Sequence, residues 1–266
     1  MSEIFLHKIQ VKNFRNLQEQ TINIKEGINC IFGKNGNGKT NILEAIYYLN
    51  NKKSFRKNTS FPQLLSVDCD KPEIIFNSIY KKKSGTFTYT GKISNKSHSW
   101  FKDNRPTKNK TGLLCEFINP FDSFSFHTVP AFRRNWVDQH LAKISKNYKM
   151  VLNKYQRIIR QRNVLLSKKN SNCISQIEAL DEIISELTII IIKERKEFFK
   201  EIEQYCTATF KNIFDVHHTV ILEMKSKFEN FSVNNVQKYF NETRQLDIEA
   251  GITRYGVHKD DFIFFF

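Results

Sequence analysis

The segment from Gly33 to Thr40 has the clearest potential for chemistry, because it fits the pattern G-x-x-x-x-G-K-[ST]. Glycines in such a loop let successive backbone N–H groups surround phosphate oxygens at the positive end of a helix. Lys39 is then expected to reach the β- and γ-phosphates of ATP, and the Thr40 hydroxyl is expected to bind Mg²⁺. The pattern therefore predicts an ATP and Mg²⁺ site made of Gly33, Lys34, Asn35, Gly36, Asn37, Gly38, Lys39 and Thr40.

Such a loop lies between a strand and a helix, and the flanking residues predict both. The apolar run from Ile28 to Phe32 predicts a strand that enters the loop. Apolar residues then recur at helical spacing and predict a helix from about Lys39 to Asn50. A glycine-rich turn that binds nothing is the alternative interpretation. The strand and helix on either side favour nucleotide binding.

Alternating apolar and polar residues predict further strands around this loop. Residues 3–14 and 21–25 alternate as the half-buried strands of a β-meander do. Three more strands are predicted over residues 73–80, 86–90 and 97–101. The first part of the chain is therefore expected to form a mixed sheet that holds the phosphate loop.

From residue 128 the pattern becomes helical. One helical region is predicted to about residue 166, and a second helix follows with apolar residues at heptad a and d positions over residues 177–191. Two such helices are expected to pack as an antiparallel hairpin. The polar face of the first region carries a basic stripe, which consists of Arg133, Arg134, Lys143, Lys146, Lys149, Lys154, Arg157, Arg160 and Arg162.

The end of the chain predicts strands again, over residues 219–224, 246–252 and 262–266. These strands are expected to return to the first sheet. The predicted organisation is thus an ATP-binding lobe over residues 1–125, a helical lobe over residues 126–215, and a return to the ATP-binding lobe over residues 216–266.

Composition narrows the possible classes of protein. The chain has 266 residues, 40% of them hydrophobic, which suits one or two globular domains. No stretch approaches the roughly 20 apolar residues of a membrane span, and the five cysteines are scattered singly, which predicts reduced thiols in the cytoplasm and no zinc site. A net charge of +15 predicts attraction to nucleic acid. Solvated surface lysine in a Lys- and Asn-rich chain is the alternative.

Several blocks of the sequence together resemble the RecF family of bacterial recombination-repair ATPases. They are Val11–Leu17, the loop with its following residues to Tyr47, Ser54–Arg56, Pro130 with Arg133-Arg134 and Val137-Asp138, Tyr155 with Arg160–Leu166, and Gly251–Thr253 with Gly256–Phe262. The blocks occur in the family's order and spacing over essentially the whole chain.

The resemblance implies a P-loop NTPase head of the ABC and SMC type, with an α/β nucleotide-binding lobe and a helical second lobe. It also implies ATP-dependent dimerisation and binding to single-stranded or gapped DNA in replication, recombinational repair and the SOS response. RecO and RecR are the implied partners in loading RecA. By position, Arg56 is similar to the basic residue that couples DNA to ATP in SMC-type heads, and Asp122 lies where such proteins join their lobes.

Two departures from the family pattern affect the expected activity. Val257 and Lys259 stand where the family has proline and arginine, and lysine cannot make arginine's planar bidentate contacts. The family's signature motif and Walker B carboxylates lie beyond the last matched block, and the pair Asp260-Asp261 lacks the apolar strand that should precede a Walker B pair. We therefore expect a chain without the C-terminal part of the family, which binds ATP but hydrolyses it poorly alone.

Two other functions remain open from the sequence. One is the ATPase head of an ATP-dependent nuclease of the overcoming-lysogenisation-defect type, although no clustered carboxylates of a nuclease are evident. The other is a basic scaffold protein whose phosphate loop is inactive. The sequence leaves open which DNA structure is preferred, and whether the chain is a fragment or a natural truncation.

Overall fold

The computed structural model describes residues 4–168, 173–214 and 220–265 and divides the chain into two compact units, Met1–Ile118 and Asn119–Phe266. The boundary differs from the predicted one at residue 125, and the second unit includes the end of the chain, which the sequence places in the first lobe. Each unit has its own hydrophobic core.

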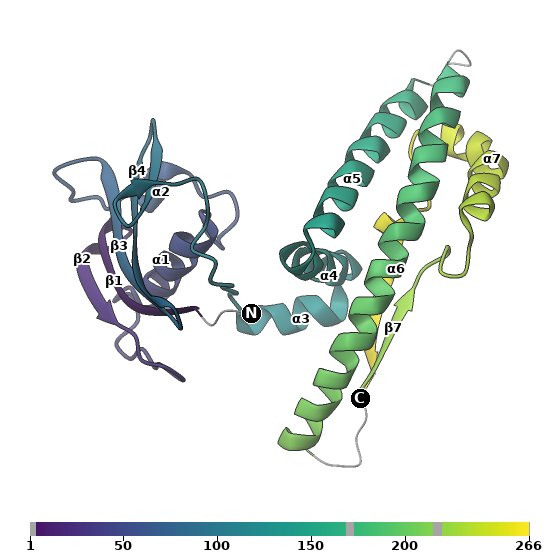
Figure 1. The fold of residues 1–266 in the computed structure, drawn as a ribbon. Helices are drawn as coiled ribbons and strands as arrows, with labels where there is room; N and C mark the ends of the chain where they lie inside the picture. Colours follow the sequence, from purple (N-terminus) through teal and green to yellow (C-terminus); the bar gives the residue numbers. More distant parts are fainter. Residues whose placement is uncertain (1–3, 169–172, 215–219, 266) are drawn as a thin grey trace. The chain divides into compact units, whose positions relative to one another are not determined.

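The first unit is built on a six-stranded sheet in the order β2-β1-β3-β4-β5-β6 (Figure 1). Every strand pair in it is antiparallel, whereas the sequence predicts a mixed sheet. The alternating pattern is confirmed, because β1 buries Ile9 and Val11 while the residues between and beside them face outward. The strands are β1 (Ile4–Phe14), β2 (Leu17–Asn23), β3 (Glu73–Lys82), β4 (Gly85–Ser94), β5 (His98–Lys102) and β6 (Arg105–Pro106).

Helix α1 (Lys39–Asn51) packs on one face of this sheet, followed by the short α2 (Phe61–Leu64). Its apolar stripe buries Ala45, Tyr48 and Leu49, as the helical spacing predicted. The rings of Tyr48 and Phe76 stack at 5.8 Å between centroids, which ties the helix to β3. The helix that must carry the phosphate loop is therefore fixed to the sheet.

Gly91 in β4 is a glycine for a packing reason. A Cβ atom there would lie 2.5 Å from the Trp100 ring of β5, so only a residue without a side chain lets the indole lie flat against the strand. The Lys52 ammonium lies 5.0 Å from the centroid of the same ring.

The predicted strand before the phosphate loop does not form. Residues 24–38 run without strand pairing, and Ile28 and Phe32 are 93% and 88% exposed. A strand needs a neighbour for its backbone N–H and C=O groups, and none of the described strands pairs with this segment. The apolar run alone was therefore not sufficient for a strand.

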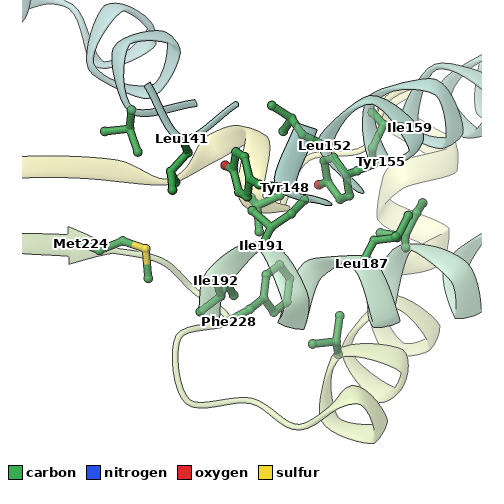
Figure 2. Packing of buried hydrophobic residues seen from close by; sticks show 14 of the residues in the cluster. Leu141, Tyr148, Leu152, Tyr155, Ile159, Leu187, Ile191, Ile192, Met224 and Phe228 are labelled. Atoms are coloured by element: carbon green, nitrogen blue, oxygen red, sulfur yellow. The ribbon is translucent and has the colours of Figure 1, made fainter. Parts of the chain in front are cut away.

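The second unit is helical and centres on α5 and α6, which run side by side (Figure 1). The predicted hairpin is present, and Figure 2 shows Leu152, Tyr155 and Ile159 of α5 packing with Leu187 and Ile191 of α6. The helices are α3 (Pro120–Thr128), α4 (Pro130–Ile144), α5 (Lys146–Ser167), α6 (Ile174–Ile213), α7 (Val233–Ala250) and the 3-10 turn η2 (Val257–Lys259).

One predicted continuous helical region and one predicted strand were wrong. The first helical region is not continuous, because Ser145 ends α4 and its side chain accepts a hydrogen bond from Tyr148 N (3.0 Å) as the cap of α5. Residues 246–252 are not a strand, because α7 continues to Ala250 and Gly251 ends it in a left-handed conformation (φ 70°). The predicted break at 168–172 falls almost entirely outside the described residues.

The strands β7 (Ile221–Lys225) and β8 (Asp261–Phe265) pair with each other and not with the first sheet. Met224 and Phe262 are buried in the helical core, and the Phe199 ring of α6 stacks on Phe262 at 4.9 Å. The predicted return of these strands to the ATP-binding sheet is therefore not observed, because their apolar side chains are covered by α4 and α6 instead.

Candidate functional site

The phosphate loop leads directly into α1, as predicted. Gly38 precedes the first helical residue with φ 82°, and no side chain caps this helix. The first backbone N–H groups of α1 therefore have no side-chain partner and point toward an exposed loop, which is the arrangement that binds anions. Gly36 also has a positive φ of 87°, so the loop depends on glycine at both positions.

The Lys39 ammonium folds back over the loop. Its Nζ donates to the carbonyl oxygens of Gly33 (2.7 Å) and Lys34 (2.9 Å). The positive charge thus lies over the concave side of the turn, where a phosphate oxygen could replace either carbonyl as acceptor. Thr40 follows in the first turn of α1 and is exposed.

Two asparagines hold the loop from outside. Asn16 Nδ2 donates to the Gly36 carbonyl (3.0 Å), and Asn41 Nδ2 donates to Asn16 Oδ1 (2.8 Å). A Cβ atom at Gly38 would lie 2.7 Å from Asn16 Oδ1, so the amide and the loop backbone are in close contact. The turn between β1 and β2, where Asn16 lies, therefore supports the phosphate loop.

Glu44 of α1 is the buried acid of this region. It is 0% exposed, and Arg15 donates to it through Nε (3.1 Å) and Nη2 (2.8 Å). Ser54 Oγ donates to Glu44 Oε1 (2.6 Å), and Arg56 Nη1 lies 3.1 Å from Oε2. One carboxylate therefore joins the turn after β1, the helix, and the loop that follows the helix.

Arg56 connects this acid with the asparagines. Its Nη2 donates to Asn41 Oδ1 (2.8 Å), while its side chain is 37% exposed. A continuous set of polar contacts therefore runs from Glu44 through Arg56, Asn41 and Asn16 to the Gly36 carbonyl. Of these residues, Gly36 and Arg56 are predicted from the sequence as site residues, whereas Glu44, Asn41 and Asn16 are not.

The other members of this network were missed, although one signal was available. Glu44 lies on the apolar face of α1, between residues that must face the sheet. A carboxylate in such a place needs a cationic partner, because an unpaired buried charge is costly. No such signal marks Asn16 or Asn41, since exposed asparagines are common in turns and at helix starts.

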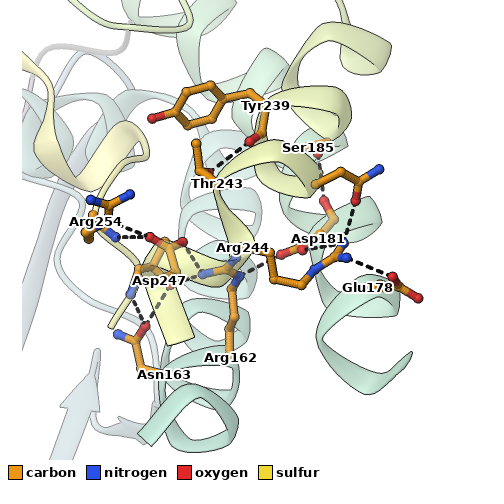
Figure 3. A network of polar contacts seen from close by, with 12 residues as sticks. Arg162, Asn163, Glu178, Asp181, Ser185, Tyr239, Thr243, Arg244, Asp247 and Arg254 are labelled. Atoms are coloured by element: carbon orange, nitrogen blue, oxygen red, sulfur yellow. Dashed lines mark hydrogen bonds and ion pairs between the residues drawn. The ribbon is translucent and has the colours of Figure 1, made fainter. Parts of the chain in front are cut away.

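The basic stripe of the helical unit is partly structural. Arg133 makes a bidentate pair with Asp261 (2.8 Å for both contacts), and Arg134 donates to the Asp260 carbonyl (2.9 Å). Arg162 is fully buried and binds Asp181, Asp247 and Thr253, as Figure 3 shows for the two carboxylates. These three arginines are therefore committed to the fold and not to a ligand.

The Asp260-Asp261 pair is likewise committed. Asp260 accepts from buried Arg195 Nη1 (2.8 Å), and burial raises the pKa of Asp260 to about 6, with the arginine opposing that shift. Asp261 pairs with Arg133. Burial lowers the pKa of the neighbouring His258 to about 4, and its Nδ1 lies 2.9 Å from the Tyr155 hydroxyl.

Asp122 caps a helix. Its Oδ2 accepts from the Asn119 backbone N–H (2.9 Å) at the start of α3, in a capping box with the Asn119 side chain. Among the described residues, no group of three His, Cys, Asp or Glu side chains is placed to hold a metal ion. No described helix is long and apolar enough to cross a membrane.

Comparisons with known proteins agree on one family. Residues 5–99 match the family model described as the RecF/RecN/SMC N terminal domain. The chain is 32% identical over 267 residues to the DNA replication and repair protein RecF of a Clostridium botulinum strain, with 97% of this chain and 73% of that protein covered. It is 28% identical over 274 residues to the RecF of Streptococcus gordonii, with 98% and 74% covered.

A solved structure shares the fold. The structure of the recombination mediator protein RecF-ATP in the RecFOR pathway superposes with a TM-score of 0.81 at 23% identity, covering 98% of this chain and 73% of that one. The predicted fold class, a P-loop α/β head of the ABC and SMC type with a helical second lobe, is thereby confirmed.

Proposed function

The chain belongs to the RecF family of DNA replication and repair proteins, and on that premise we propose that residues 33–40 bind ATP with Mg²⁺ and that the protein acts on DNA. The proposal of ATP binding is supported by the described loop, and the proposal of DNA binding is supported by the net charge of +15. A cytoplasmic setting, with five free cysteines, is part of the same proposal.

One observation carries the nucleotide proposal, namely the uncapped start of α1 with the Lys39 ammonium folded over the loop. Backbone N–H groups and one lysine are the two kinds of donor that a polyphosphate requires. The lysine now uses carbonyl oxygens of Gly33 and Lys34 as acceptors. Phosphate oxygens carry more negative charge than carbonyls and would replace them.

The Thr40 hydroxyl would hold Mg²⁺, which supplies charge neutralisation between the terminal phosphates when it is bound. Thr40 suits this role because it follows Lys39 in the first turn of α1 and is exposed. Asn16 and Asn41 would keep the loop in shape through the Gly36 carbonyl. In this proposal the chain's own residues bind and orient the nucleotide.

DNA is the second proposed ligand, with single-stranded or gapped DNA as the form that the family suggests. RecO and RecR as partners, a role in loading RecA and an ATP-dependent homodimer are proposed on the family alone. The alternative of a nuclease-linked ATPase is not favoured by any described cluster of carboxylates.

The nucleotide proposal is tested by equilibrium binding of a fluorescent ATP analogue with Mg²⁺ to the wild-type chain, Lys39→Ala and Lys34→Ala. Lys39→Ala should weaken binding about 100-fold or more, because a charge-assisted contact to phosphate is lost. Lys34→Ala is the matched control, since the Lys34 contribution described here is its backbone carbonyl. Equal losses in the two variants, or no binding by wild type at millimolar nucleotide, would contradict the proposal.

A further inference from the structure

A basic cavity of about 400 Å³ lies in the first unit, beside α1 and the loop that follows it. Its lining includes the cationic side chains of Lys52, Lys53 and Arg56, together with His98, Ser54 and Thr59. In the described part of the chain, no carboxylate lines this cavity. The cavity lies apart from residues 33–40, none of which contributes to its lining.

Two of its cations are held in place by the fold. Lys52 Nζ donates to the Lys108 carbonyl (3.0 Å) and lies over the Trp100 ring. Burial and the nearby Lys110 lower the pKa of Lys52, so the positive charge there has an energetic cost that a bound anion would reduce. Arg56 is fixed by Glu44 and Asn41. An anion therefore meets preorganised charge.

The net charge around the cavity is positive even when the ion pairs of its residues are counted. Glu44 is the acid that holds Arg56, and it is shared with Arg15, so one negative charge serves two positive charges. Lys53 and His98 are exposed at the cavity and can move toward a ligand. The arrangement suits a phosphate group with cationic donors around it.

The lining also includes Phe61, a half-buried residue that packs against the core of the first unit. Rings next to cations are the combination that binds single-stranded nucleic acid, since a base can stack while its phosphate is neutralised. A cavity of this volume admits one nucleotide of a flexible strand but not the width of a duplex.

We propose that this cavity binds a backbone phosphate of single-stranded DNA, with Lys53 as the principal mobile cation and Lys52 and Arg56 as fixed ones. The proposal rests on the DNA-binding function proposed above and assigns that function to a particular place. Residues 33–40 do not line the cavity, so ATP binding and DNA binding are measured with different ligands at different places.

The test is the fluorescence anisotropy of a labelled oligothymidylate with the wild-type chain, Lys53→Glu and Lys57→Glu at about 0.1 M salt. Lys53→Glu should weaken binding about tenfold, and Lys57→Glu about twofold at most. Lys57 is the matched control, because it is an exposed lysine of the same loop that does not line the cavity. Lys53→Glu should also reduce the salt slope by about 0.7.

Three outcomes would overturn the proposal. Equal losses for the two variants would show that DNA responds to the general charge of the loop and not to the cavity. An unchanged salt slope in Lys53→Glu would show that Lys53 neutralises no backbone phosphate of the oligonucleotide. No binding of the oligonucleotide by wild type would remove the proposed DNA function itself, while the ATP-analogue measurement would still report on the loop.

Discussion

At the scale of single residues, Glu44 is the side chain on which the proposed site depends most. It has no exposed surface, and its two oxygens accept from Arg15, Ser54 and Arg56. A buried acid with so many donors is costly to remove, because the arginines remain behind without their partner. The residue therefore links the stability of the first unit to the shape of the phosphate loop.

We predict that Glu44→Gln lowers the free energy of unfolding of the first unit by about 2–4 kcal/mol. Glu19→Gln, which removes the acid of an exposed pair with Lys12, should cost about 0–1 kcal/mol. Urea unfolding followed by Trp100 fluorescence, in a Trp136→Phe background, measures the first unit by itself. Equal shifts in midpoint for the two variants would contradict the central role of Glu44.

The chemistry of the phosphate loop could be predicted from single residues, but its support could not. The types and spacing of Gly33–Thr40 are set by the needs of phosphate binding, which any fold must meet in a similar way. Asn16 and Asn41 act through contacts between segments 25 residues apart. Such contacts depend on how the turn after β1 packs beside α1, and this packing cannot be predicted from a local sequence pattern.

At the scale of secondary-structure elements, local patterns predicted strands and helices where one face is buried. The alternation in β1, β3 and β4 and the apolar stripe of α1 are of this kind. Residues 28–32 have the composition of a strand but no described neighbour to pair with. Residues 246–252 were misassigned because short apolar runs suit a helix end as well as a strand.

The elements at the end of the chain are joined to the helical unit by buried polar contacts, and these should respond to pH. His258 in η2 has a pKa lowered to about 4 by burial, from 6.5 in the unfolded chain. Below pH 6.5 the unfolded chain gains a proton that the folded chain does not, so His258 lowers stability as pH falls toward 4. The expected loss is about 1–2 kcal/mol at pH 5.

We therefore predict that His258→Gln is less stable than wild type at pH 7.5, by about 1 kcal/mol for the lost contact with Tyr155. At pH 5 this difference should shrink or reverse. Urea unfolding followed by Trp136 fluorescence, in a Trp100→Phe background, gives both values. Asp260 titrates in the same range, but it is present in both proteins, so the comparison isolates the histidine. A difference independent of pH would contradict the prediction.

At the scale of the whole molecule, the proposed binding residues and the acidic pair of the sequence analysis lie in different units. Residues 33–40 belong to the first unit, whereas Asp260 and Asp261 belong to the second and are paired with Arg195 and Arg133. Hydrolysis of ATP needs a carboxylate or an equivalent group free to orient the attacking water. Neither of these two acids is free for that purpose.

We predict that the 266-residue chain binds ATP with Mg²⁺ but releases phosphate at the background rate of Lys39→Ala. Phosphate release is measured at saturating nucleotide with wild type and Lys39→Ala in parallel, after the binding experiment has fixed the concentration needed. Hydrolysis by wild type that Lys39→Ala abolishes would show that another group orients the water.

The flat contact between Gly91 and Trp100 limits which substitutions the core of the first unit can accept. The Trp100 indole lies against Gly91, where any side chain would collide with it. The Lys52 ammonium lies over the same indole, and Lys52 also lines the basic cavity. A side chain at position 91 would therefore displace the Trp100 ring and, with it, the Lys52 ammonium that lies over the ring. Redesigning this part of the core for stability would therefore also shift a cation that lines the basic cavity.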